Sequence, residues 1–207
     1  MSGDVHVRIC ERLGVRLPRA TRLVVLIDSH PRQDWLVKAV EKRLREELAK
    51  LRVEINEEKS RMVDLSKGES FCFLGFEYRR ILSRNRVWRA QYVPRLKKRT
   101  ALLAKLKEIF RRYVSQPVGR VIELINPILR GWVNYFAVGH SSRCFTFIKD
   151  WVERKIRRHL MRARLRSGFG WKRWSRTWLY ERLGLFHEYR LRRYDPRSKA
   201  QPIRTVT

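Results

Sequence analysis

Acidic residues are scarce in this sequence. Its 207 residues include 20 Asp and Glu against 49 Lys and Arg, which gives a formal net charge of +29. This imbalance favours a polyanionic partner, and nucleic acid first, because each Lys or Arg seated on a phosphate releases condensed counterions. Ribosomal proteins and basic membrane-surface proteins have a similar composition, so the charge alone does not identify the function.

Cysteine is also scarce, and long apolar runs are missing. Cys10, Cys72 and Cys144 are too few and too widely spaced for a disulfide framework or a CxxC zinc pair, so we expect buried or incidental thiols. The longest apolar runs, such as residues 23–27, are too short to span a bilayer, and no signal peptide opens the chain. We therefore expect a cytoplasmic protein that does not associate with membranes. The seven Trp, seven Tyr and nine Phe argue against a disordered chain.

The basic residues are distributed unevenly. Residues 1–80 contain 17 basic and 13 acidic residues, whereas residues 81–207 contain 32 and 7. The net charge therefore rises from +4 in the first part to +25 in the second. A boundary near residues 81–94 is marked by Ser83-Arg84-Asn85-Arg86 and by Pro94.

The first part has the pattern of a mixed helix and strand domain. Residues 23–27 form a short β-branched apolar run that predicts a buried strand, and Ser29-His30-Pro31 is typical of a helix start. Short strands are expected at residues 52–55 and 61–65. Residues 71–78 predict a strand interrupted at Gly75, where a bulge or a close backbone approach is expected, and a return strand follows at Val87-Trp88.

The second part has the periodicity of three amphipathic helices. The first begins just after Pro94, the second begins at Pro117, and the third covers about residues 145–166. Pro127 lies inside the second helix and predicts a kink or a break, because proline lacks the backbone donor. Three such helices predict a small bundle, so the fold class expected for the whole chain is α+β.

Two stretches carry a family resemblance. Ile55-Asn56-Glu57-Glu58-Lys59-Ser60, followed by Phe73-Leu74-Gly75-Phe76, is similar to the end of the palm in group II intron reverse transcriptases. Residues 125–136, Ile-Asn-Pro-Ile-Leu-Arg-Gly-Trp-Val-Asn-Tyr-Phe, resemble the signature of the maturase-specific domain of the same family, also called the thumb or X domain. The signature residues in this sequence are Asn126, Pro127, Gly131, Trp132, Tyr135 and Phe136.

The resemblance covers about residues 23–178 and implies a division of the chain. Residues 23–90 correspond to a remnant of the palm, residues 91–180 to the maturase-specific domain, and residues 181–207 to a basic C-terminal tail. Residues 1–22 do not resemble the family and are left unassigned.

One departure from the family bears on catalysis. Family members have Tyr-Ala-Asp-Asp directly before the strand that corresponds to residues 23–27, whereas this sequence has Arg19-Ala20-Thr21-Arg22. Polymerisation requires carboxylates that hold two metal ions, and Thr21 and Arg22 cannot replace them. The fingers and the front of the palm are missing as well. We therefore expect a truncated family member without polymerase activity, catalytic residues, bound metal or cofactor.

The resemblance implies binding of structured group II intron RNA and assistance to its folding and splicing. Basic helices would neutralise crowded phosphates while the ribozyme performs the chemistry. Two alternatives remain open: a thumb that acts in trans with a separately encoded finger and palm fragment, or a remnant without function. The expected RNA-binding residues are the Lys and Arg residues of the basic part: Lys97, Lys98, Arg111, Arg112, Arg130, Arg143, Arg154, Arg157, Arg158, Arg162, Arg166, Lys172, Arg173 and Arg176.

Aromatic residues near these cations allow two interpretations. The spacing of Trp132, Tyr135 and Phe136 matches the apolar stripe of their helix, so most are expected in the core. The intervals between Trp171, Trp174 and Trp178 fit a packing stripe and a base-stacking platform equally well.

Overall fold

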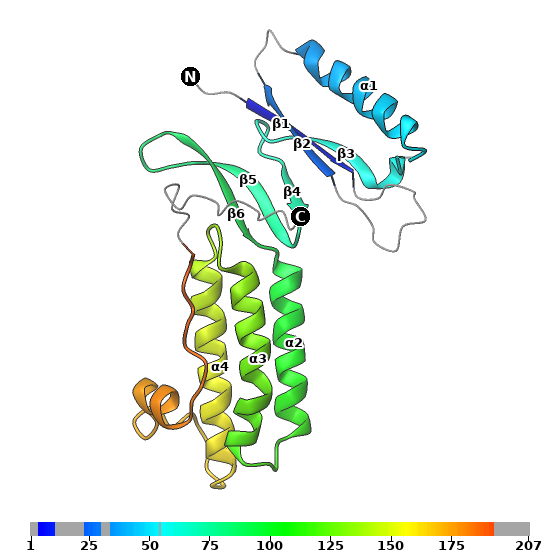
Figure 1. Ribbon diagram of the computed structural model, residues 1–207. Helices are drawn as coiled ribbons and strands as arrows, with labels where there is room; N and C mark the ends of the chain where they lie inside the picture. The colour runs from blue at the N-terminus through cyan, green and yellow to red at the C-terminus, as the bar shows by residue number, and fades with distance from the viewer. Residues whose placement is uncertain (1–3, 11–22, 30–33, 54, 193–207) are drawn as a thin grey trace, which may run out of the picture. The chain divides into compact units, whose positions relative to one another are not determined.

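The computed structural model describes residues 4–10, 23–29, 34–53 and 55–192. They form an α+β protein of two compact units that divide between Arg95 and Leu96. The first unit contains strands and one long helix, and the second is helical (Figure 1). Within the described ranges, no helix combines the length and the apolar character needed to cross a membrane.

The first unit contains a three-stranded antiparallel sheet in the order β2-β1-β3. Its strands are β1 (Asp4–Cys10), β2 (Leu23–Ser29) and β3 (Ser60–Asp64), and helix α1 (Asp34–Lys50) follows β2 in the chain. The strand expected at residues 23–27 is therefore confirmed, but its expected burial is not, since Leu26 is 65% exposed. The central strand β1 lies within residues 1–22, which the family resemblance does not cover. Arg19-Ala20-Thr21-Arg22 lies outside the described residues.

The described part of helix α1 begins at Asp34, and His30 and Pro31 of the expected helix start lie outside the described residues. The strand expected at residues 52–55 is wrong at its start, where Arg52 lies in a turn, and Glu54 lies outside the described residues. Arg52 has a φ of 53°, and the chain turns directly after α1 through the hydrogen bond from Val53 N to Leu48 O, 2.9 Å long.

A second antiparallel sheet in this unit has the order β4-β5-β6, with β4 (Ser70–Phe73), β5 (Phe76–Leu82) and β6 (Trp88–Pro94). The expected interruption at Gly75 is a two-residue hairpin turn and not a bulge: Phe73 pairs with Phe76, and Leu74 and Gly75 have φ of 47° and 81°. Both values are positive, as in a type I′ turn. The Gly75 carbonyl also accepts a hydrogen bond from Arg95 N at 2.9 Å, which is a close backbone approach.

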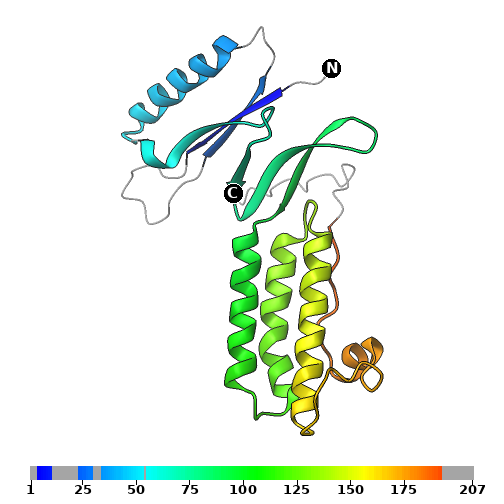
Figure 2. The ribbon, with the colours of Figure 1, turned by 180° about the vertical axis from the view of Figure 1, so that it is seen from behind.

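The second unit is a bundle of three helices, α2 (Leu96–Arg112), α3 (Val118–Phe136) and α4 (Ser142–Arg162). They lie side by side in both views (Figures 1 and 2). Each helix turns its apolar stripe inward, because burial of these side chains removes most of their apolar surface from water. The side chains that are completely buried include Leu106, Ile125, Leu129, Ile148 and Ile156, each 0% exposed.

Pro127 does not break α3, which continues from Val118 to Phe136. Ile125 and Leu129, on either side of the proline, are both fully buried in the bundle, so packing holds the two halves in one helix. Glu123, whose carbonyl loses its helical donor, is exposed, and water can hydrate that carbonyl.

The chain after α4 returns along the bundle (Figure 2). A π-helical turn at Trp178–Arg182 is followed by an extended segment in which Leu185 and Phe186 are buried. Asn126 holds this segment: its Nδ2 donates to Gly184 O at 2.8 Å, and its Oδ1 accepts from Phe186 N at 2.9 Å. The part of the proposed tail up to residue 192 therefore packs on α3, where Arg192 N also donates to Ala137 O at 2.6 Å.

Candidate nucleic-acid interface

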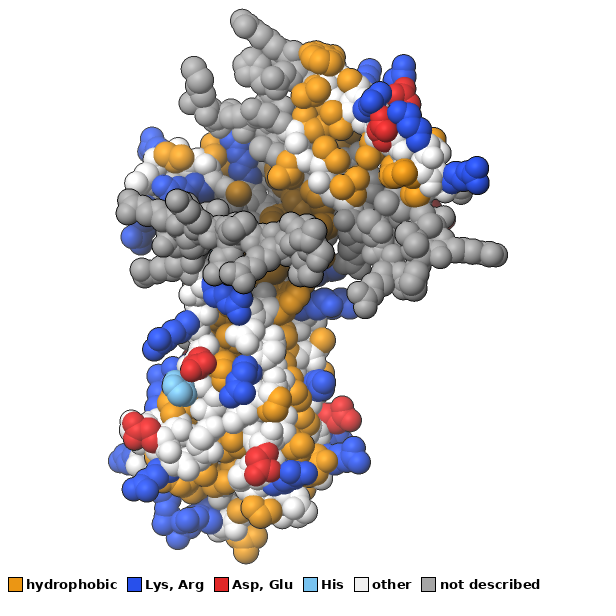
Figure 3. Space-filling model, viewed as in Figure 1, with side chains coloured by type: hydrophobic (Ala, Val, Ile, Leu, Met, Phe, Trp, Pro, Cys, Tyr) orange, Lys and Arg blue, Asp and Glu red, His pale blue; other side chains and the backbone are white. Residues whose placement is uncertain are grey.

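Most of the basic residues selected from the sequence are exposed on the helical unit. Thirteen of the fourteen are exposed, and Lys and Arg side chains gather at the lower end of that unit (Figure 3). They occupy the two ends of α2, the exposed side of α3, the outer side of α4 and the segment after it. Exposure is required for contact with RNA, and thirteen side chains meet this requirement.

Arg157 is the exception, and its assignment to an exposed contact face is wrong. Its side chain is 1% exposed. The guanidinium donates through Nε to Trp174 O at 2.9 Å and through Nη1 to Glu153 Oε2 at 3.2 Å, and it lies 4.2 Å from the ring centroid of Trp171. The segment that folds back over α4 covers this arginine, so it holds the domain together from inside.

Glu153 is the acceptor at the centre of this cluster. Its carboxylate is 1% exposed and also accepts hydrogen bonds from Arg176 Nε at 3.0 Å and from the Tyr180 hydroxyl. Burial alone would raise the pKa of Glu153, but hydrogen bonds from Tyr180, Arg176 and Arg157 outweigh it and lower the pKa. Arg176 also pairs with Asp150 at 2.7 Å, so its charge is already partly compensated.

The topology brings the C-terminal ends of α2 and α4 to the same end of the bundle (Figure 1). His159 Nε2 lies 3.0 Å from Gln116 O, and the Phe110 ring contacts both Trp151 and His159. These contacts fix the last turns of α4 beside α2. The cations that the two helices carry near these ends are therefore held on one rigid surface.

On the outer side of α4, two adjoining hollows of about 220 and 250 Å³ share Arg158 and Phe169. We call them the α4 groove. Among the described residues that line it, five are basic and none is acidic. The side chains that line it include Trp151, Arg154, Lys155, Arg158, Arg162, Arg166 and Phe169.

Lys155 is surrounded by like charges. Partial burial lowers its pKa, and Arg158, Lys107 and Arg162 lower it further. The side chain thus lies where a bound anion would relieve electrostatic repulsion. Neither Lys155 nor Lys107 was among the residues expected from the sequence to bind RNA, although Lys155 directly follows Arg154.

Two aromatic side chains of the groove were also missed. Lys155 Nζ lies 5.2 Å from the ring centroid of Trp151, and the Arg158 guanidinium lies 4.8 Å from that of Phe169. Phe169 reaches α4 because the chain reverses at Gly168 and Gly170, whose φ values are 93° and 63°. The paired glycines were the available sequence signal for this reversal.

Some of the aromatic residues near the cations pack in the core, and others are exposed as base stacking requires. Trp174 is 3% exposed and Trp178 is partly buried, so these two pack, whereas Trp171 is 50% exposed. In α3, Phe136 is buried and Trp132 partly so, as expected for core residues, but Tyr135 is 55% exposed.

The remaining signature residues of α3 fall into two groups. Asn126 is explained by its two hydrogen bonds to the returning segment. Pro127 and Gly131 are exposed, and a Cβ added to Gly131 would meet no atom within 4 Å. The packing of this chain therefore does not require glycine at position 131.

No group of three or more His, Cys, Asp or Glu side chains in the described parts of the chain is placed to hold a metal ion. Cys144 is partly buried beside Arg99; burial raises the pKa of its thiol, and Arg99 opposes that shift.

Comparison with known families identifies the helical unit. Residues 99–184 match the family described as the group II intron, maturase-specific domain. A comparison with curated proteins finds no match. The matched region begins inside α2 and ends at Gly184, the residue whose carbonyl binds Asn126. Residues 99–184 of this chain therefore form a domain of the group II intron maturase-specific type.

Proposed function

We propose that this protein binds group II intron RNA through its helical unit and assists the folding and splicing of that RNA. The observation that supports the proposal most is the match to the maturase-specific domain over the same residues that carry the exposed cations and the α4 groove.

The proposed action is electrostatic. Phosphates of separate RNA helices repel each other when a compact fold brings them together, and a fixed array of cations lowers this cost. Arginine suits the task, because its planar guanidinium pairs with two phosphate oxygens and stacks on exposed bases. In this proposal the RNA supplies the catalytic groups, and the protein acts by binding.

The α4 groove is the proposed centre of contact. Arg154, Arg158 and Arg162 are exposed and lie one turn apart on one side of α4, whereas Arg157 is buried. Phe169 and Trp151 offer apolar surface between these cations, where an unpaired base can stack while its phosphates meet the guanidinium groups.

We also propose that residues 23–90 correspond to the rear of a reverse-transcriptase palm. The tight β4–β5 turn at Leu74-Gly75 supports this, because it lies within the Phe-Leu-Gly-Phe motif that carries the resemblance. In this proposal the first unit supports the RNA-binding domain and performs no polymerisation.

The test compares binding to a group II intron RNA with binding to an unrelated structured RNA of equal length, at low and at physiological salt. We expect the intron to bind more tightly at both salt concentrations. If about eight cations contact phosphate, log K falls with log salt at a slope of about −6. Equal affinities for the two RNAs at both salts would contradict the proposal.

A triple reversal, Arg154→Glu, Arg158→Glu and Arg162→Glu, tests the groove itself. Three lost phosphate contacts should weaken intron binding at least about tenfold. The matched control reverses Lys42, Arg43 and Lys50 of α1, which changes the net charge equally but lies in the first unit. An equal loss in both variants would show that only total charge matters.

A further inference from the structure

The sheet β4-β5-β6 has one aromatic face. The strand register places Phe71 opposite Tyr78 and Tyr78 opposite Tyr92. Their rings stack with centroids 4.9 and 5.5 Å apart and interplanar angles of 7° and 17°. Trp88 lies on the same face, because it precedes Tyr92 by four residues in β6 and side chains alternate along a strand.

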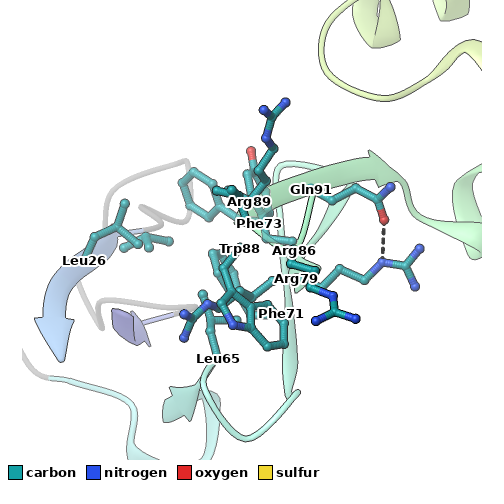
Figure 4. Close-up of a pocket in the computed structure, with 14 residues that line it drawn as sticks. Leu26, Leu65, Phe71, Phe73, Arg79, Arg86, Trp88, Arg89 and Gln91 are labelled. Atoms are coloured by element: carbon teal, nitrogen blue, oxygen red, sulfur yellow. Dashed lines mark hydrogen bonds between the residues drawn. The ribbon is translucent and has the colours of Figure 1, made fainter. Parts of the chain in front are cut away.

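One end of this face is covered and the other is open. Phe71 is buried against Val63, with Val24 and Leu65 packed around them. Nearer the β5–β6 loop, these side chains no longer cover the face. A pocket of about 820 Å³ lies there between Leu26 of β2 and the β5–β6 hairpin. Figure 4 shows Trp88 in the middle of the labelled side chains that line it. The volume is in the range of small-ligand pockets.

Trp88 is presented as a stacking surface. Its side chain is 48% exposed, and the Arg80 guanidinium lies over its ring, 4.6 Å from the centroid. The guanidinium lies over one face of this electron-rich ring, and the exposed part of the side chain is accessible from the pocket. The indole therefore offers a flat apolar surface of the kind on which a nucleobase stacks.

The charge around the pocket favours an anionic ligand. Residues 76–94 contain five Arg and one Glu, whereas residues 1–75 contain 15 basic and 12 acidic residues. Arg79, Arg80, Arg86 and Arg89 all line the pocket. Arg79 donates to Gln91 at 2.7 Å on the face opposite the aromatic one, so it braces the hairpin (Figure 4).

We propose that this pocket binds an unpaired nucleotide of single-stranded RNA, with its base stacked on Trp88 and the flanking phosphates near Arg80 and Arg86. An apolar peptide would match the walls at Val24 and Leu26 but not the arginines. A duplex does not fit, because its bases are already stacked on each other. The inference rests on the proposed function, since it gives the same class of partner a second contact in the first unit.

The test uses the full chain and a fluorescent oligouridylate of about twelve nucleotides, with fluorescence anisotropy as the readout. Trp88→Ala should weaken single-strand binding about fivefold or more, and Trp88→Phe should retain most of it, because a phenyl ring still stacks. Trp35→Ala is the matched control, since Trp35 is 66% exposed on α1 of the same unit. We expect no change for this variant.

A duplex RNA of the same length separates stacking from general attraction. Trp88→Ala should leave duplex binding within about twofold, because the change removes no charge. Wild-type affinity of Trp88→Ala for the single strand, or an equal loss for single strand and duplex, would overturn the inference. Circular dichroism of Trp88→Ala confirms that the variant is folded.

The two proposals fail separately. If Trp88→Ala binds oligouridylate like the wild type while the triple reversal on α4 loses intron binding, only the pocket is rejected. If Trp88→Ala loses oligouridylate binding while the α4 reversal has no effect on intron binding, the α4 interface is rejected and the pocket stands.

Discussion

The side chain of Asn126 in α3 is bonded to the backbone at Gly184, 58 residues later in the chain. The same amide accepts a hydrogen bond from Phe186 N, so both of its polar atoms are used. An asparagine is suited to this position because its donor and acceptor lie side by side and bind two backbone groups of one passing segment.

Replacing Asn126 by Asp should therefore destabilise the helical unit. The change keeps the acceptor for Phe186 N but removes the donor and places a carboxylate against the Gly184 carbonyl. We expect a loss of about 1–3 kcal/mol in the free energy of unfolding, measured by urea denaturation. Asn134→Asp, at an exposed position of the same helix, is the control. Equal stability of the two variants would show that the Asn126 bonds contribute nothing.

Replacing Glu153 by Gln should have a larger effect. The buried Arg157 would lose its charged partner, and Arg176 and Tyr180 would lose their acceptor or its charge. Removing one partner of a buried ion pair costs about 3–5 kcal/mol. Thermal and urea unfolding measure this loss, and Glu123→Gln, on the exposed side of α3, serves as the control. A change below about 1 kcal/mol would contradict a structural role for the cluster.

The same carboxylate predicts a pH dependence. The pKa of Glu153 is lowered in the folded protein, so the unfolded chain binds its proton more readily. The contribution of Glu153 to the free energy of unfolding is fully present above the ordinary glutamate pKa of about 4.3. It is lost as the pH falls through the lowered pKa of the folded protein. The stability difference between wild type and Glu153→Gln should therefore shrink below about pH 4. A difference that grows on acidification would contradict the sign of the shift.

The turn of the β4–β5 hairpin offers a stabilising change. Leu74 has a φ of 47°, which disfavours a branched apolar residue, and its side chain is 51% exposed. Asparagine is preferred at the first position of a type I′ turn. Leu74→Asn should therefore raise the free energy of unfolding by about 0.5–1 kcal/mol. Gly75→Ala should lower it, since Gly75 has a φ of 81°. Chemical denaturation of the two variants tests both directions.

Replacing each of two glycines in the helical unit by alanine should change the stability of the protein in opposite directions. A Cβ on Gly170 would lie 2.5 Å from the buried Trp174 ring, and its φ of 63° is unfavourable for alanine. Gly131 has open space and helical geometry. We expect Gly170→Ala to cost about 1–3 kcal/mol and Gly131→Ala to add about 0.5–1 kcal/mol. Melting temperatures that move in the same direction for both variants would contradict this assignment.

The sequence predicted the helical unit well because apolar spacing specifies helices directly. The third helix, expected at about residues 145–166, is Ser142–Arg162. Pro127 does not break α3, because tertiary packing at Ile125 and Leu129 overrides a local preference. Strand β1 was left unassigned, although Val5, Val7 and Ile9 alternate with polar residues as half-buried strands do.

The error at Arg157 has a different origin. A Glu–Arg pair four residues apart is equally compatible with an exposed and a buried helix face, and the segment that covers this pair begins more than a dozen residues later. The α4 groove escaped prediction for the same reason, because Phe169 joins it only through the reversal at Gly168 and Gly170. Helical periodicity describes one helix and carries no information about which later segment returns to it.

The returning segment has a consequence for the order of folding. The bond from Asn126 to Gly184 closes a loop of 58 residues, longer than the 43 residues between Gln116 and His159 within the bundle. Such distant closures form late in folding, and segments held by few of them open first. We therefore expect residues 170–192 to join the bundle last and to leave it first. Because they bury Arg157, their detachment would expose an additional cation next to the α4 groove.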